Sequence, residues 1–198
     1  NLDDLEAAIG RAQDAVNATP VDHPHRAGCL NNLSSHLFSR FDRMGNLDDL
    51  EAAIGRAQDT VNATPVNHPN RAMYLNNLSN RLSSRFDRTG NLDDLEAAIG
   101  RAQDAVNATP VDHPDRAMYL NNLSNRLSSR FDRTGNLDDL EAAIGRAQDA
   151  VNATPVDHPD RAGRLNNLSS HLSRRFDRTG NLDDLEAAIG RAQDAVNA

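Results

Sequence analysis

Residues 91–135 read NLDDLEAAIGRAQDAVNATPVDHPDRAMYLNNLSNRLSSRFDRTG, and this stretch decides the fold because the rest of the chain repeats it. Its opening segment begins again at residues 1, 46, 136 and 181. The 198 residues therefore form a single repeat array with units at 1–45, 46–90, 91–135, 136–180 and a final half-unit at 181–198. Self-similarity at such a period indicates stacked structural repeats and argues against an ordinary two-domain enzyme.

The first half of each unit predicts an amphipathic helix, which we name the Ala-rich helix. In residues 91–110, Asn91 is a good N-cap, two aspartates occupy the first turn where the helix dipole favours negative charge, and Thr109-Pro110 ends the helix. A helix of about 17 residues is expected. Its apolar residues, spaced by three and four, are Leu92, Leu95, Ala98, Ile99, Ala102, Ala105 and Val106.

The second half predicts another helix, which we name the Asn-rich helix. It follows a short loop at residues 111–114 and ends at Gly135, a favourable C-terminal residue. Asn and Ser side chains fill a neutral polar sector, and Arg126, Arg130 and Arg133 form a separate cationic sector. The apolar stripe is Ala117, Leu120, Leu123, Ser124, Leu127 and Phe131.

The order of these helices predicts an all-α chain, an α-solenoid of antiparallel helix pairs. Nine helices alternate with short loops, and no segment shows the alternation typical of strands. Each helix is expected to bury its apolar face against the helices before and after it.

Composition narrows the classes of partner. All 21 basic residues are Arg, against 29 acidic ones, and the formal charge of −8 disfavours nonspecific nucleic-acid binding. No apolar run approaches the roughly 18 residues of a membrane span, and the amino terminus shows no secretory signal. A single Cys29 cannot form an internal disulfide. We therefore expect a soluble, cytoplasmic protein without nucleic-acid or membrane partners.

The segment DHPDRA at 157–162, followed by LNNL at 165–168, resembles the tetratricopeptide repeats of kinesin light chains. Related arrays are attached to fungal and bacterial caspase-like (CHAT) and nucleotide-binding receptor proteins. The 45-residue unit exceeds the 34-residue consensus, so we expect an Asn-rich helix about one turn longer than usual. The positions that match the tetratricopeptide pattern are Leu120, Leu123, Ser124, Leu127, Ala143, Ala150 and Pro155. The resemblance implies a noncatalytic scaffold for protein–protein interaction.

No catalytic, metal or cofactor site is expected. One His lies in each loop, and most units have no second His or Cys at a ligand spacing. We interpret these loop histidines as supports of the helix start, and His36 and His171 as surface variants of Arg81 and Arg126. No nucleophile elbow of the form Gly-x-Ser-x-Gly is present.

The paired asparagines in the middle of each Asn-rich helix are the strongest candidates for a binding role. Asn is a mediocre helix former, and its amide both donates and accepts, which suits recognition of an extended peptide backbone. The resemblance implies that they line a concave groove, where we expect them to contribute more to binding than to stability. Hydrogen bonding between repeats is the alternative. The candidate groove comprises Asn31, Asn32, Ser35, Met73, Asn76, Asn77, Asn80, Met118, Asn121, Asn122, Asn125, Ser128, Asn166, Asn167 and Ser170.

Differences between the copies offer a second clue. Positions such as Gly28/Met73/Met118/Gly163 vary and lie off the apolar stripe, which indicates either groove diversification or surface drift. The invariant glycines within the Ala-rich helices, such as Gly100, are interpreted as points of close helix approach, with drift as the alternative.

The predicted function is a scaffold that binds an extended peptide or a partner helix. The alternative is a sensor or oligomerisation array of a larger signalling or defence protein, which associates end to end. Under that alternative the chain is a segment of a longer array, because the first and last helices carry the same apolar residues as the internal ones, including Leu2 and Leu185.

Overall fold

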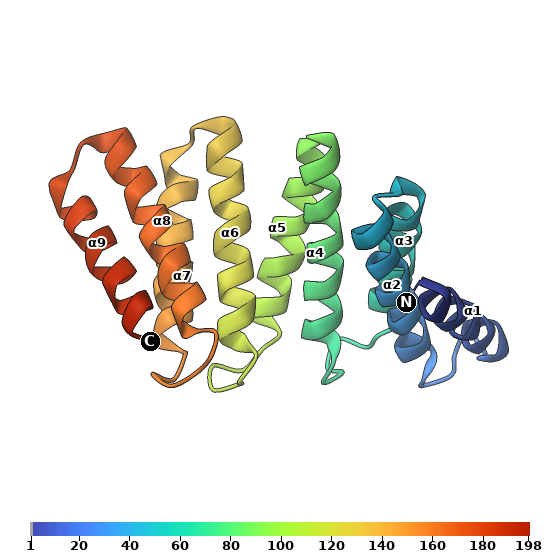
Figure 1. Cartoon of the computed structure of the whole chain (residues 1–198). Helices are drawn as coiled ribbons and strands as arrows, with labels where there is room; N and C mark the ends of the chain where they lie inside the picture. Colours follow the sequence, from blue (N-terminus) through green and yellow to red (C-terminus); the bar gives the residue numbers. More distant parts are fainter. Residues whose placement is uncertain (1) are drawn as a thin grey trace. The chain divides into compact units, whose positions relative to one another are not determined.

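The computed structural model describes residues 2–198, and within them it contains nine α-helices and no strand (Figure 1). The predicted all-α architecture and the alternation of helices are confirmed. The Ala-rich helices are α1 (Leu2–Ala18), α3 (Leu47–Asn62), α5 (Leu92–Asn107), α7 (Leu137–Asn152) and α9 (Leu182–Asn197). The Asn-rich helices are α2 (Arg26–Met44), α4 (Arg71–Thr89), α6 (Arg116–Thr134) and α8 (Arg161–Thr179).

The Ala-rich helices begin as the sequence predicts, at an asparagine N-cap. The side chain of Asn46 accepts a hydrogen bond from the backbone N–H of Asp48 at 3.0 Å, and Asn136 accepts one from Asp138 at the same distance. These bonds satisfy donors that the first turn of a helix cannot pair internally. The N-cap therefore fixes the start of the helix locally, without help from tertiary contacts.

The Asn-rich helices end at glycines in the left-handed conformation. Gly135 has φ of +71°, and its N–H donates to the carbonyl oxygen of Phe131 at 2.7 Å. Gly45, Gly90 and Gly180 have φ of 70° or 71° and make the equivalent bond. A side chain would strain this backbone, so the glycine at this position determines where the helix stops.

The histidine loops support the start of the next helix, as predicted. In one loop, Nδ1 of His68 accepts a hydrogen bond from the N–H of Asn70 at 3.1 Å. The guanidinium of Arg71 then donates to the carbonyl oxygens of Val61, at 3.2 Å, and Thr64. The arginine thereby satisfies carbonyls at the end of the preceding Ala-rich helix and ties it to the Asn-rich helix.

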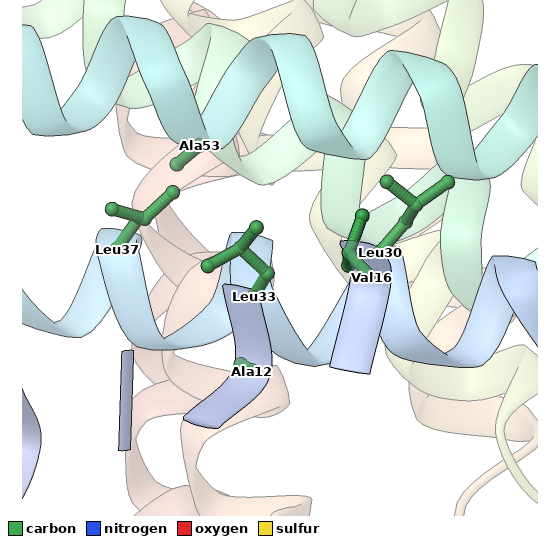
Figure 2. Close-up of a cluster of buried hydrophobic side chains, with 6 residues drawn as sticks. All are labelled: Ala12, Val16, Leu30, Leu33, Leu37 and Ala53. Carbon is green, nitrogen blue, oxygen red and sulfur yellow. The ribbon is translucent and has the colours of Figure 1, made fainter. Parts of the chain in front are cut away.

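The chain divides into two compact units, residues 2–105 and 106–198, which are described separately. In the first unit, α2 lies between α1 and α3. Figure 2 shows Leu33 and Leu37 of α2 projecting toward the helix that carries Ala53. The complete cluster is Ala12, Val16, Leu30, Leu33, Leu37 and Ala53. In the second unit, α8 packs in the same way between α7 and α9, through Ala147, Val151, Leu165, Leu168, Leu172 and Ala188.

Ala residues at these contacts let the helices approach closely. Leu33 is 1% exposed and Ala53 is fully buried, and Oγ of Ser34 donates to the Ala53 carbonyl at 2.7 Å. Leu168 and Ala188 are buried in the equivalent place in the second unit. Truncating such a buried leucine to Ala costs about 2–5 kcal/mol, so these small interfaces supply much of the stability of each unit.

The interpretation of the internal glycines as points of close approach is wrong. A Cβ built on Gly55, Gly100 or Gly145 would meet no neighbouring atom within 4 Å. These glycines lie on the exposed side of the Ala-rich helices, and the close packing is made by the alanines instead.

Candidate functional site

Within each unit, an asparagine pair forms a hydrogen bond between the polar faces of two Asn-rich helices. In the first unit, Nδ2 of Asn77 on α4 donates to Oδ1 of Asn31 on α2 at 3.0 Å. In the second unit, Asn167 on α8 makes the same bond to Asn121 on α6, also at 3.0 Å. The structure thus shows hydrogen bonding between repeats for these pairs. This bond uses one amide donor and one amide acceptor of each pair, and it leaves the other donors and acceptors of these amides for other partners.

A buried arginine closes the α2–α4 contact one turn further along. Arg81 is 4% exposed, and its guanidinium donates to the Asn77 carbonyl at 2.8 Å and to Oγ of Ser35 at 3.1 Å. It also lies 5.2 Å from the ring centroid of Phe38. Burial lowers the pKa of Arg81 to about 10, although Asp42 acts in the opposite direction, so the side chain remains cationic at neutral pH.

The predicted cationic sector is therefore not a free positive face. Arg126 is buried like Arg81, and Arg130 binds Asp139 of the next Ala-rich helix through two hydrogen bonds, of 2.9 and 2.5 Å. The same bidentate pair joins Arg85 to Asp94. Helical spacing in the sequence shows which arginines share a sector of one helix. It does not show their acidic partners, because these lie on the next helix and are determined by packing.

In the second unit the α6–α8 groove contains two hollows, one on either side of the Asn121–Asn167 bond. The first encloses about 400 Å³ and the second about 240 Å³. The first is lined by Met118, Asn121, Pro159, Asp160, Gly163, Arg164, Asn166 and Asn167. The second is lined by Asn125, Ser128, Ser129, Asp132, Asn167, Ser170, His171 and Arg174. Seven of the predicted groove residues, Met118, Asn121, Asn125, Ser128, Asn166, Asn167 and Ser170, thus come together here.

The charged groups in this groove are paired. Arg174 donates to Oγ of Ser128 and lies 3.3 Å from the carboxylate of Asp132. Arg164 lies 3.2 Å from the carboxylate of Asp160 and also donates to Oγ1 of Thr154. Burial lowers the pKa of the Arg164 guanidinium below its usual value. The groove therefore presents neutral polar groups with compensated charges, not an anion site.

His171 is not a surface variant, and that interpretation is wrong. It is 3% exposed, and neither ring nitrogen has a hydrogen-bond partner within the described part of the chain. Burial, reinforced by the positive charge of Arg174, lowers the pKa of His171 to about 4, so the ring is neutral at pH 7. His171 faces the preceding Asn-rich helix, α6. The spacing of residues within α8 alone does not reveal this contact.

The other predicted residues occupy different environments. In the first unit, Met73 is exposed, Asn80 is half-buried, and Asn76 is buried at 4% exposure. Asn122 is half-buried and is engaged in an interaction. Asn32 is exposed and lines a separate hollow of about 260 Å³ beside α1. That hollow is bordered by Ala8, Arg11, Ala12, Ala15, Cys29, Asn32 and His36.

The predicted site omitted several residues that the structure places in the groove. They are Ser129, Asp132, Pro159, Asp160, Gly163, Arg164, His171 and Arg174. Variation between copies was a usable signal, because Gly163, Arg164, His171 and Arg174 each differ from the residue at the equivalent position of α4 and α6. Some variable positions off the apolar stripe are nevertheless buried, since Tyr119 is 2% and Arg164 6% exposed.

Two further observations concern membrane-spanning helices and metal sites. Among residues 2–198, no helix combines the length and hydropathy needed to cross a membrane. The same residues contain no group of three or more His, Cys, Asp or Glu side chains arranged to hold a metal ion.

Comparison with solved structures shows the fold class. The crystal structure of MamA is similar, with a TM-score of 0.66 at 15% identity, over 98% of this chain and 88% of that one. A structure described as a Podosopora anserina putative kinesin light chain with nearly identical TPR-like repeats gives a TM-score of 0.67 at 14% identity. The match covers 94% of this chain and 86% of that one. At such identities the similarity defines the class, an α-solenoid of TPR-like helix pairs.

The family follows from sequence. Residues 71–115 and 116–160 each match the tetratricopeptide repeat family model. Residues 71–160 therefore form tetratricopeptide repeats, the same unit recurs along the rest of the chain, and the chain has the fold of kinesin-light-chain-like repeats. The family frame begins each repeat at the Asn-rich helix, whereas the units counted from Asn46 and Asn91 begin at the Ala-rich helix. A search of the curated proteins found no match.

Proposed function

We propose that the protein is a noncatalytic interaction scaffold that binds an extended peptide, or a helix of a partner protein, along the polar face of its Asn-rich helices. Tetratricopeptide repeat arrays are generally scaffolds for protein interaction, and the groove between α6 and α8 supports a site of this kind. The observation that carries the proposal is that hollows flank the Asn121–Asn167 bond while Asn166 and Ser170 remain exposed.

The chemistry of this face suits a peptide backbone. Carboxamides and hydroxyls can pair with both the N–H and the C=O groups of an extended chain, and a ladder of them follows such a chain without requiring a charge. The groove arginines are already paired with aspartates, so they do not create a strong field of one sign. A neutral backbone is therefore a better ligand for this surface than a polyanion.

The proposal is tested with a displayed library of random linear twelve-residue peptides, selected on the full chain. We expect binders, and we expect Asn166→Arg combined with Ser170→Arg to abolish their binding by filling the groove. Ala142→Arg, at an exposed site on α7, is the control and should bind normally. Failure to select any binder, or equal binding by the groove and control variants, would refute the proposal.

A second candidate function is end-to-end assembly. Ile189 and Val196 on α9 are 51% and 87% exposed, whereas the equivalent Ile54 and Val61 on α3 are 9% and 4% exposed. A second copy could cover this face as α4 covers α3. Light scattering up to millimolar chain should show association that Ile189→Asp with Val196→Asp removes, and a monomer throughout would contradict it.

As part of the main proposal we place the scaffold in the cytoplasm, since Cys29 is a free thiol.

A further inference from the structure

Two positions on α8 distinguish it from the Asn-rich helices α4 and α6. Gly163 stands where α4 and α6 carry Met73 and Met118, and His171 stands where they carry Arg81 and Arg126. Each replacement removes bulk from the side of α8 that borders the groove. Gly163 lines the first of the two hollows, and His171 lines the second.

The first hollow has room and apolar walls beside Gly163. A Cβ built on this glycine would meet no atom within 4 Å, so its lack of a side chain leaves open space. Met118, which is 37% exposed, and Pro159 border this space. Among the residues lining this hollow, the charged ones are Arg164 and Asp160, which are paired at 3.2 Å, and the Arg164 side chain is 8% exposed. A bulky apolar side chain fits this chemistry.

The second hollow is small, polar and without net charge. Asn125 and Ser170 contribute neutral polar groups, and the charges of Arg174 and Asp132 compensate each other at 3.3 Å. In the α2–α4 contact the equivalent position is filled by the guanidinium of Arg81, which reaches Ser35 and Phe38. The shorter imidazole of His171 cannot extend so far. The hollow of about 240 Å³ suits a small neutral polar side chain such as a carboxamide or hydroxyl.

We propose that the α6–α8 groove is the selective site of the array, and that it takes a peptide with a bulky apolar side chain in the Gly163 hollow and a small neutral polar side chain in the His171 hollow. This inference rests on the proposed peptide-binding function. The residues that line the two hollows are displaced along α6 and α8 by roughly 8–13 Å, at 1.5 Å of rise per residue. An extended peptide covers that span in about three or four residues.

The experiment uses the displayed twelve-residue library on the full chain, followed by fluorescence anisotropy with a synthetic consensus peptide. Gly163→Met and His171→Arg restore the residues that α6 carries and should fill one hollow each. Gly28→Met and His36→Arg are matched controls, because α2 carries the same glycine and histidine at the equivalent positions. Circular dichroism of all four variants checks that they fold.

The expected consensus pairs an apolar residue with Asn, Gln, Ser or Thr three or four positions away. Gly163→Met should weaken binding at least tenfold and abolish the apolar preference, whereas His171→Arg should abolish the polar preference. Both control variants should bind as the original chain does. Peptides that bind the original chain and all four variants equally would overturn this inference while leaving the scaffold function intact. Failure to select any peptide would overturn both.

Discussion

Alanine substitution of the glycines within the Ala-rich helices should stabilise the protein. Gly55, Gly100 and Gly145 are exposed, and an added Cβ at each meets nothing within 4 Å. The change in free energy of unfolding therefore reduces to helix propensity and unfolded-state entropy, about 0.5–1 kcal/mol per site. Because no neighbouring atom is shared, the three effects should add to about 1.5–3 kcal/mol.

The assay is urea and thermal unfolding of the triple variant, followed by circular dichroism at 222 nm. For a chain of this size, each kcal/mol corresponds to roughly 2–4 °C in the unfolding midpoint. Gly135→Ala provides a control of opposite sign, since its φ of +71° strains any side chain at a cost of about 1–2 kcal/mol. Its Cβ would lie 3.9 Å from Arg178, so no clash contributes. A triple variant no more stable than the original chain would refute the reasoning.

Three further changes test the polar contacts. Replacing Asn77 and Asn167 by Ala should lower stability by about 1 kcal/mol per lost hydrogen bond, partly offset by the better helix propensity of Ala, and an unchanged midpoint would show that these amides are not architectural. His171 has a folded pKa of about 4, below its unfolded value of 6.5, so its stability contribution is complete above pH 6.5 and falls by about 3 kcal/mol as the pH drops to 4. The free energy of unfolding should therefore fall less between pH 7 and pH 4.5 in His171→Gln than in the original chain. An equal fall in the two proteins would contradict this prediction. Arg85→Ala should cost about 2 kcal/mol in urea unfolding, because Asp94, which is 4% exposed, loses its bidentate partner. A change within 0.5 kcal/mol, about that of an ordinary surface substitution, would show that water replaces the guanidinium.

The helices and their ends could be predicted because their causes are local. Asn46 accepts from a donor two residues away, and Gly135 takes its left-handed conformation at the end of its own helix. The apolar stripe of Leu30, Leu33 and Leu37 is likewise a consequence of 3.6 residues per turn. Such short-range signals are repeated in every unit, so the sequence alone determined the order of helices and the repeat architecture.

The candidate site could be predicted only in part. The sequence identified Asn121 and Asn167 as polar residues of one face, but their mutual hydrogen bond joins residues 46 positions apart. Likewise, the sequence indicated a surface position for His171, whereas the structure buries this side chain beside the α6–α8 groove. Both features depend on how neighbouring helices pack, because that packing determines which side of a helix is covered.

The chain's own pattern thus determined which residues form helices, where each helix begins and ends, and which face carries the leucines. The tertiary structure decided which residues are bonded, buried or open: Arg81 links two helices from a buried position, Gly100 is exposed, and Gly163 lines a hollow. The physical reason is range. Helix propensity, capping and periodicity act within a few residues, whereas burial and hydrogen-bond partners depend on atoms that only the packing of separate helices brings together.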